Sequence, residues 1–131
     1  MTDNEVLFNY RLREAEETLA EAEKMRSENF SPRTIANRAY YSMFYALLAL
    51  FLRSGVEIKT SKHYRLISLF DQEFVKQAKF GKRYSTMLHD NFDLRQEGDY
   101  KDLIQIPREK AEQAVKNARE FLAAIKDFIN Q

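Results

Sequence analysis

Residues 39–52 read AYYSMFYALLALFL and form the longest apolar stretch of the chain, interrupted only by Ser42. On a helix these side chains cover nearly the whole circumference, which only a helix surrounded by partners can accept. The stretch is 14 residues long, whereas a membrane-spanning helix needs about 20. We therefore expect residues 32–53 to form the central helix of a bundle or a helix at a subunit interface, and we expect no membrane span.

The composition of the whole chain predicts an all-α protein. Its 131 residues suit one domain over residues 1–131, with enough apolar material to bury a single core. Only 3 Gly and 2 Pro are present, too few for the many tight connections of a β-sandwich or barrel. With 0 Cys and 2 His, we expect no disulfide, no metal site and no cofactor.

Amphipathic patterns on both sides of the central stretch predict the other helices. They cover residues 6–26, residues 61–77, a segment from after Gly81 to near Gly98, and a last helix from Pro107, with a connector at residues 99–106. Short connections favour antiparallel neighbours, so we expect an up-and-down bundle of four to five helices.

Capping residues predict where these helices begin and end. Ser31 and Pro32 suit the start of the central helix, and Gly55 its end. Thr60 or Ser61 is the predicted cap of the next helix. Gly98 is the predicted C-terminal cap of the helix that precedes the connector.

Charge is balanced overall but uneven along the chain. The formal net charge is +1, whereas residues 31–100 carry 11 basic and 7 acidic side chains. This basic middle segment suits either solvated helix faces or an anion-facing groove. The residues from Met1 to Asn9 are polar and acidic, unlike the basic and apolar start of a signal peptide. We therefore expect a cytoplasmic protein.

Candidate site residues lie beside the apolar helices, because the sequence holds no Walker loop, dinucleotide-binding glycine pattern or HExxH motif. Arg38 suits either a structural ion pair or a phosphate. Tyr41 lies three residues after Arg38, so the two share a helix face. His63 opens a helix, where it either caps and packs or helps orient an anion.

A second cluster closes the fourth helix. Arg95 and Asp99 are four residues apart, the spacing of an ordinary ion pair on a helix. Tyr100 follows directly. The cluster suits either a charged turn or part of a binding cleft. His89 lies on the same predicted helix, and we assign it no role.

Taken together, these segments resemble the HEPN domain family, in its small stand-alone branch. The resemblance covers most of the chain and rests on Asn37-Arg38-Ala39-Tyr40-Tyr41-Ser42-Met43-Phe44-Tyr45-Ala46, Ser61-Lys62-His63, Phe74-Val75-Lys76 and Leu94-Arg95-Gln96-Glu97-Gly98-Asp99-Tyr100. It implies a helical bundle that forms homodimers around a shared cleft. It also implies one of two functions. One is a metal-independent ribonuclease in a toxin–antitoxin or defence pair with a minimal nucleotidyltransferase. The other is a non-catalytic nucleotide-binding or assembly partner of such an enzyme.

The ribonucleases of this family carry an Arg followed after about four to six residues by a His, which help activate the ribose 2′-OH and stabilise phosphate charge. Arg95 matches that Arg, but Tyr100 stands where the His is expected, and no His follows it. A phenol, with an ordinary pKa of about 10, is a poor general base at neutral pH. The resemblance therefore implies a phosphate-binding Arg95, with cleavage weak, lost or carried by another residue such as His63.

Our predicted site combines Arg95, His63 and Tyr100 as catalytic candidates with Arg38, Tyr41 and Asp99 as ligand-binding candidates, facing RNA or a nucleotide. By analogy with paired family members, Tyr100 is also a candidate target for nucleotidylation by the partner enzyme. A non-enzymatic module that serves only assembly is the competing hypothesis.

Overall fold

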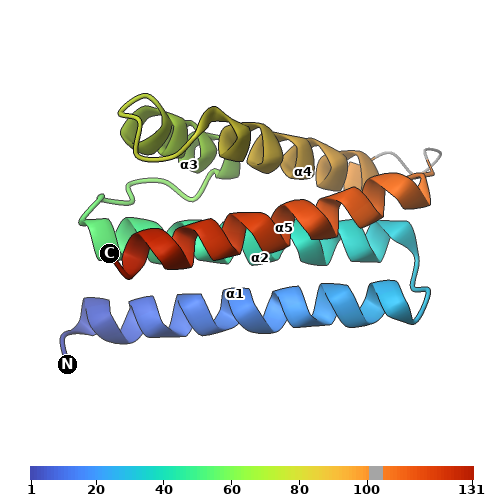
Figure 1. Cartoon of the computed structure of the whole chain (residues 1–131), viewed down its shortest axis with the longest axis horizontal. Helices are drawn as coiled ribbons and strands as arrows, with labels where there is room; N and C mark the ends of the chain where they lie inside the picture. Colours follow the sequence, from blue (N-terminus) through green and yellow to red (C-terminus); the bar gives the residue numbers. More distant parts are fainter. Residues whose placement is uncertain (101–104) are drawn as a thin grey trace.

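The computed structural model describes residues 1–100 and 105–131 and confirms the all-α prediction. The elements are α1 (Asp3–Ser27), α2 (Pro32–Ser54), α3 (His63–Phe70), a π-helical turn η1 (Asp71–Val75), α4 (Lys82–Tyr100) and α5 (Arg108–Ile129). The long helices α1, α2, α4 and α5 run alternately in opposite directions, and the short α3 lies at one end beside α4 (Figure 1). The predicted up-and-down bundle is therefore correct.

Helix α2 is the central helix of this bundle, as the apolar stretch predicts. It contacts α1, α4 and α5, and residues on all its sides are buried, among them Ile35, Tyr40, Met43, Leu47 and Phe51. By length and composition alone α2 would also pass for a membrane-spanning helix, but 67% of its apolar window is buried inside the protein. Its apolar circumference is explained by the three helices packed around it.

Both predicted ends of α2 are confirmed. The Ser31 hydroxyl accepts a hydrogen bond from the Thr34 backbone N–H at 3.2 Å, and Pro32 occupies the first helical position. Gly55 ends the helix with φ 73°, a left-handed conformation that glycine adopts without a steric cost.

The predicted helix over residues 61–77 is correct in type but wrong in its start and its regularity. Lys62, not Thr60 or Ser61, precedes the first helical residue, and it makes no side-chain cap. The Thr60 hydroxyl instead accepts a hydrogen bond from the Lys62 N–H at 3.1 Å, which tightens the turn before the helix. After Phe70 the chain widens into the π turn, and both Phe70 and Phe74 remain in the core.

The predicted role of Gly98 as a helix cap is wrong. Gly98 is buried within α4, which continues to Tyr100 and so extends into the predicted connector. A Cβ atom at this position would lie 2.8 Å from Ile106 Cδ1 and 3.4 Å from Arg33 Cγ. Close packing of α4 against these neighbours, not the end of the helix, explains the glycine.

Candidate functional site

An open surface pocket of about 350 Å³ lies between the start of α3 and the second half of α4; we call it the α3–α4 pocket. Its lining residues are Ser61, Lys62, His63, Tyr64, Phe92, Arg95 and Gln96. They include two basic side chains and an imidazole but no carboxylate, so the lining favours an anion. His63 and Arg95, two predicted site residues from separate helices, meet here.

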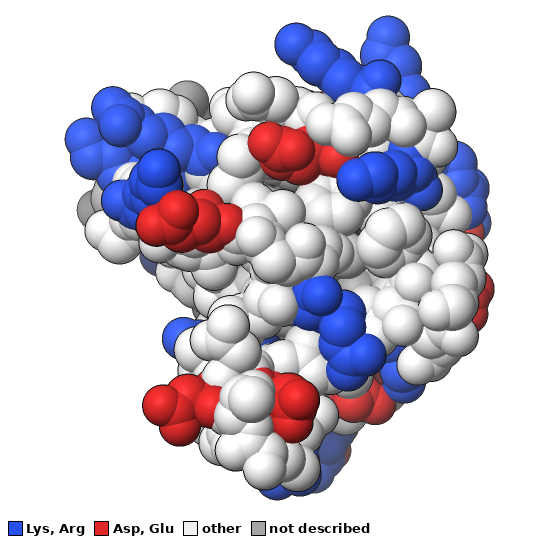
Figure 2. Space-filling view, turned by 90° about the vertical axis from the view of Figure 1, so that its left-hand side faces the viewer, with Lys and Arg blue, Asp and Glu red and all other residues white. Residues whose placement is uncertain are grey.

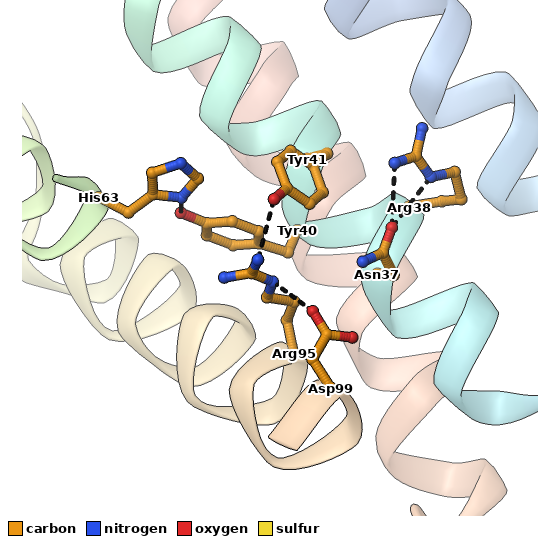
Figure 3. A network of polar contacts seen from close by, with 7 residues as sticks. All are labelled: Asn37, Arg38, Tyr40, Tyr41, His63, Arg95 and Asp99. Carbon is orange, nitrogen blue, oxygen red and sulfur yellow. Dashed lines mark hydrogen bonds and ion pairs between the residues drawn. The ribbon is translucent and has the colours of Figure 1, made fainter. Parts of the chain in front are cut away.

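His63 is held by aromatic side chains of α2. Its Nδ1 lies 2.8 Å from the Tyr40 hydroxyl (Figure 3). Its ring also stacks on Phe44, with the centroids 3.9 Å apart. Burial raises the pKa of Tyr40 well above its ordinary value, an effect that the nearby Arg95 opposes. Tyr40 therefore keeps its proton, and its hydroxyl can donate a hydrogen bond to Nδ1; in that arrangement the proton of the neutral imidazole lies on Nε2.

The imidazole of His63 stays neutral for two reasons. Its partial burial lowers its pKa below the ordinary value, and the positive charge of Arg95 lowers this pKa further. When Nδ1 accepts the Tyr40 hydroxyl, the neutral imidazole carries its proton on Nε2 and is a hydrogen-bond donor through that nitrogen.

The guanidinium of Arg95 is positioned by three side chains. Its Nη2 donates to the Tyr41 hydroxyl at 2.9 Å, and its Cζ lies 5.2 Å from the Tyr41 ring centroid and 5.6 Å from that of Tyr40. Its Nε lies 2.8 Å from Asp99 Oδ2, so the predicted Arg95–Asp99 ion pair is present (Figure 3). The pair is not an aligned hydrogen bond, because Nε has no acceptor in hydrogen-bond geometry.

One amino group of Arg95 remains available. Although only 15% of the side chain is exposed, Nη1 has no acceptor among the described residues. Arg95 therefore brings a fixed positive charge and an open N–H group to the wall of the pocket.

Arg38 lies outside the α3–α4 pocket. Its Nε and Nη2 donate to Asn37 Oδ1 at 3.2 and 3.0 Å, and Nη1 is 3.9 Å from Glu21 Oε1. Its Cζ lies 5.4 Å from the Tyr41 ring centroid. Tyr41 thus contacts both Arg38 and Arg95 (Figure 3), which joins Arg38 to the site only indirectly.

The structure places His89, to which we assigned no role, but it does not describe the side chain of Tyr100. His89 Nε2 lies 2.7 Å from Asp71 Oδ2 of the π turn, and His89 is not part of the pocket lining. Tyr100 ends α4, but its side chain lies outside the described residues, as does its predicted role.

The predicted site left out the other lining residues, although Ser61, Lys62 and Gln96 stand in the motifs that carry the family resemblance; Tyr64 and Phe92 were missed. A signal exists for Phe92, which lies three residues before Arg95 and four before Gln96 and so shares a helix face with both. Tyr64 also carries a signal, because it departs from the apolar stripe of α3 that includes Leu66, Ile67 and Phe70.

A second pocket, of about 340 Å³, lies between α4 and α5; we call it the α4–α5 pocket. Three carboxylates line it, from Asp90, Asp93 and Glu97, together with Lys110 and five uncharged residues. Its floor holds buried amides: Asn91 Nδ2 donates to the Ala114 carbonyl at 2.9 Å, and Asn117 Nδ2 donates to Asn91 Oδ1 at 3.1 Å.

Charge elsewhere on the surface is mixed. At the end of the bundle turned toward the viewer in Figure 2, basic and acidic side chains are interspersed. Among the described residues no group of three or more His, Asp and Glu side chains is arranged to hold a metal ion. The α3–α4 pocket is distinguished by the charged groups of its own lining, Lys62 and Arg95.

Comparisons with known proteins agree with this fold. The HEPN domain model matches residues 8–128. The UPF0332 protein of Thermotoga maritima is 33% identical over 129 residues, which cover 98% of this chain and 96% of that protein.

Two similar proteins of Methanocaldococcus jannaschii bear the names "Putative toxin MJ0142" and "Putative toxin MJ0605". The first is 30% identical over 118 residues, 90% of this chain and 78% of that protein. The second is 31% identical over 117 residues, 89% of this chain and 84% of that protein. The resemblance found in the sequence motifs is confirmed: this chain belongs to the HEPN domain family.

Proposed function

We propose that this chain is a toxin-like HEPN protein whose α3–α4 pocket binds a phosphate group of RNA or of a nucleotide. One observation carries the proposal: Arg95 and His63 come from separate helices to line one pocket that no carboxylate lines. The names of the two Methanocaldococcus relatives support the toxin-like role.

In this proposal Arg95 and His63 donate to the same phosphate. Arg95 uses its Nη1 group, while Tyr41 and Asp99 hold the rest of the guanidinium in place. His63 uses its Nε2–H group, since Tyr40 occupies Nδ1. Lys62 adds a positive charge at the rim, and charge-assisted hydrogen bonds of this kind are stronger than those between neutral groups.

The hydrogen bond from Tyr40 bears on whether the site cleaves RNA. A general base must accept the proton of the ribose 2′-OH, but in the tautomer proposed here the lone pair of His63 Nδ1 accepts the Tyr40 hydroxyl instead. Passing a proton from Tyr40 through His63 would leave a buried tyrosinate, which the raised pKa of Tyr40 disfavours. This tautomer disfavours His63 as a general base and so favours a non-catalytic role, which in the second candidate function is that of a nucleotide-binding or assembly partner of a minimal nucleotidyltransferase.

A single set of measurements tests binding and cleavage together. A labelled pool of structured and single-stranded RNA is incubated with the protein in excess EDTA, and bound and cleaved RNA are both quantified. We expect Arg95→Ala to weaken RNA binding by about 10- to 100-fold, because a charge-assisted hydrogen bond contributes about 1.5–3 kcal/mol. Cleavage by the wild type that Arg95→Ala abolishes would establish a metal-independent ribonuclease, whereas binding without cleavage supports the non-catalytic candidate.

The matched control is Arg119→Ala, which removes the same charge from an exposed ion pair with Glu23, 2.6 Å away on α1. We expect it to bind RNA as the wild type does, apart from a small effect of net charge. Equal affinities for the Arg95→Ala and Arg119→Ala proteins, with both folded by circular dichroism, would refute a phosphate site at Arg95.

Assembly is a separate part of the proposal. We propose a cytoplasmic homodimer that pairs with a minimal nucleotidyltransferase, as the family resemblance implies. The exposed apolar side chains of Val6 and Leu7 on α1 support a contact surface. Light scattering at micromolar concentration tests the dimer, and a monomeric mass contradicts it; co-purification with a co-expressed minimal nucleotidyltransferase tests the partner.

A further inference from the structure

Tyr64 is an exposed aromatic side chain on the wall of the α3–α4 pocket. It lines the pocket together with His63 and Arg95, and 52% of the residue is accessible to solvent. The apolar residues that follow it in α3, Leu66 and Ile67, are buried in the core. Tyr64 therefore contributes little to the packing of the bundle, and its ring is open to a ligand.

The guanidinium of Arg65 contacts Tyr64 and places a positive charge beside its ring. Its Nε donates to the Tyr64 hydroxyl at 3.1 Å, and its Cζ lies 5.7 Å from the ring centroid. Lys62 lines the same pocket, so cationic groups precede and follow the ring in the sequence. An aromatic face beside cations is the arrangement on which single-stranded nucleic acids stack their bases and place their phosphates.

We propose that Tyr64 is a specificity-determining residue on which an unpaired base stacks, while the adjoining phosphate lies at Arg95 and His63. This inference rests on the proposed function, because it needs the phosphate site, and it narrows the ligand to a single-stranded nucleotide or RNA. A duplex does not satisfy the site, since its base faces are already covered by their neighbours in the stack.

The inference is tested with one RNA oligonucleotide in two forms, single-stranded and annealed to its complement. An adenine in the labelled strand is replaced by 2-aminopurine, whose fluorescence is quenched when the base stacks. We expect the wild type to quench this fluorescence in the single strand. We expect Tyr64→Ala to remove the quenching and to weaken single-strand binding about 5- to 100-fold, the range for one base–aromatic contact.

Two variants serve as controls. Tyr64→Phe keeps the ring face and should bind the single strand as the wild type does. Tyr10→Ala removes a similar side chain from α1, 56% exposed and with the Cζ of the neighbouring Arg11 5.5 Å from its ring centroid, but outside the pocket. It should change neither affinity nor quenching. Thermal melting and mass in solution check that every variant keeps its fold and assembly.

The outcomes separate this inference from the proposed function. If Arg95→Ala weakens binding but Tyr64→Ala does not, the phosphate site stands and base stacking on Tyr64 is refuted. If Tyr64→Ala weakens duplex binding as much as single-strand binding, or if the wild type does not quench 2-aminopurine, the preference for unpaired bases is refuted. If neither variant weakens binding, both the phosphate site and the stacking inference fail.

Discussion

The two pockets beside α4 are nearly equal in volume but opposite in chemistry. The α3–α4 pocket measures about 350 Å³ and has no carboxylate in its lining, whereas the α4–α5 pocket measures about 340 Å³ and has three. One helix contributes to both, through Arg95 on one side and Asp93 on the other. Volume therefore says little about which of the two serves a ligand.

The two pockets also differ in whether their polar side chains have hydrogen-bond partners. In the α4–α5 pocket the amides satisfy one another: Gln113 donates to Asn117 at 2.9 Å, Asn117 donates to Asn91, and Asn91 donates to a backbone carbonyl. In the α3–α4 pocket the Nη1 group of Arg95 has no acceptor among the described residues. Closed hydrogen-bond networks stabilise a fold, whereas open donors beside a pocket are available to a ligand.

The largest expected effect is on stability and comes from the α4–α5 pocket. Asn91→Ala should lower the free energy of unfolding by about 2–3 kcal/mol, because it leaves the buried Asn117 side-chain N–H group without its acceptor and removes the hydrogen bond from Asn91 to the Ala114 carbonyl. Urea titration measures this loss. RNA affinity, measured at a temperature where the variant is folded, should stay at the wild-type level.

The rim of the same pocket provides the control. Asp93→Asn changes an exposed carboxylate that forms no ion pair with a described residue, so it should alter stability by at most about 0.5 kcal/mol. A loss of RNA affinity in Asn91→Ala, at unchanged fold, would contradict the division of roles between the two pockets.

A smaller effect is expected where the α3–α4 pocket meets the core. Tyr40→Phe keeps the buried ring but removes the hydroxyl that donates to His63 Nδ1, which should cost about 1 kcal/mol of stability. With Nδ1 released, the imidazole proton should distribute between the two nitrogens, and ¹⁵N NMR of His63 should show this change. If the ¹⁵N shifts already indicate a protonated Nδ1 in the wild type, Tyr40 does not set the tautomer and His63 is free to act as a base.

The sequence was sufficient for features that depend on local spacing. The apolar circumference of residues 39–52 predicted the central helix, Ser31 and Gly55 predicted its ends, and the four-residue spacing of Arg95 and Asp99 predicted their ion pair. These features arise within one helix or at its ends, where periodicity and capping act directly.

Features that depend on packing between helices could not be predicted in the same way. Tyr40 and His63 are 23 residues apart, and Asn91 and Asn117 are 26 apart. Whether two such residues meet depends on how each helix is rotated about its own axis and how closely it packs against its neighbour. The spacing of residues within one helix determines neither. The prediction that Gly98 caps its helix was wrong for the same reason. The close contact that leaves no room for a side chain at this position comes from Ile106, which lies outside the helix of Gly98.

The smallest expected effect is the pH dependence that His63 gives to stability. Its burial, and then the charge of Arg95, lower the pKa of His63 below its ordinary value of 6.5. Around and below pH 6.5 the unfolded chain therefore binds more protons at this position than the folded protein does. The free energy of unfolding is accordingly highest above pH 6.5, and it falls as the pH is lowered toward the pKa of His63 in the folded protein. The imidazole is only partly buried, so solvent screening keeps this effect modest.

Urea titrations between pH 7.5 and 5.5 measure that dependence. His63→Gln should be less pH-dependent than the wild type over this range, and Arg95→Ala should lie between the two, because it removes one of the two causes of the lowered pKa. Equal slopes for the wild type and His63→Gln would show that His63 titrates alike in the folded and unfolded chains, and would remove the neutral donor on which its proposed contact with phosphate depends.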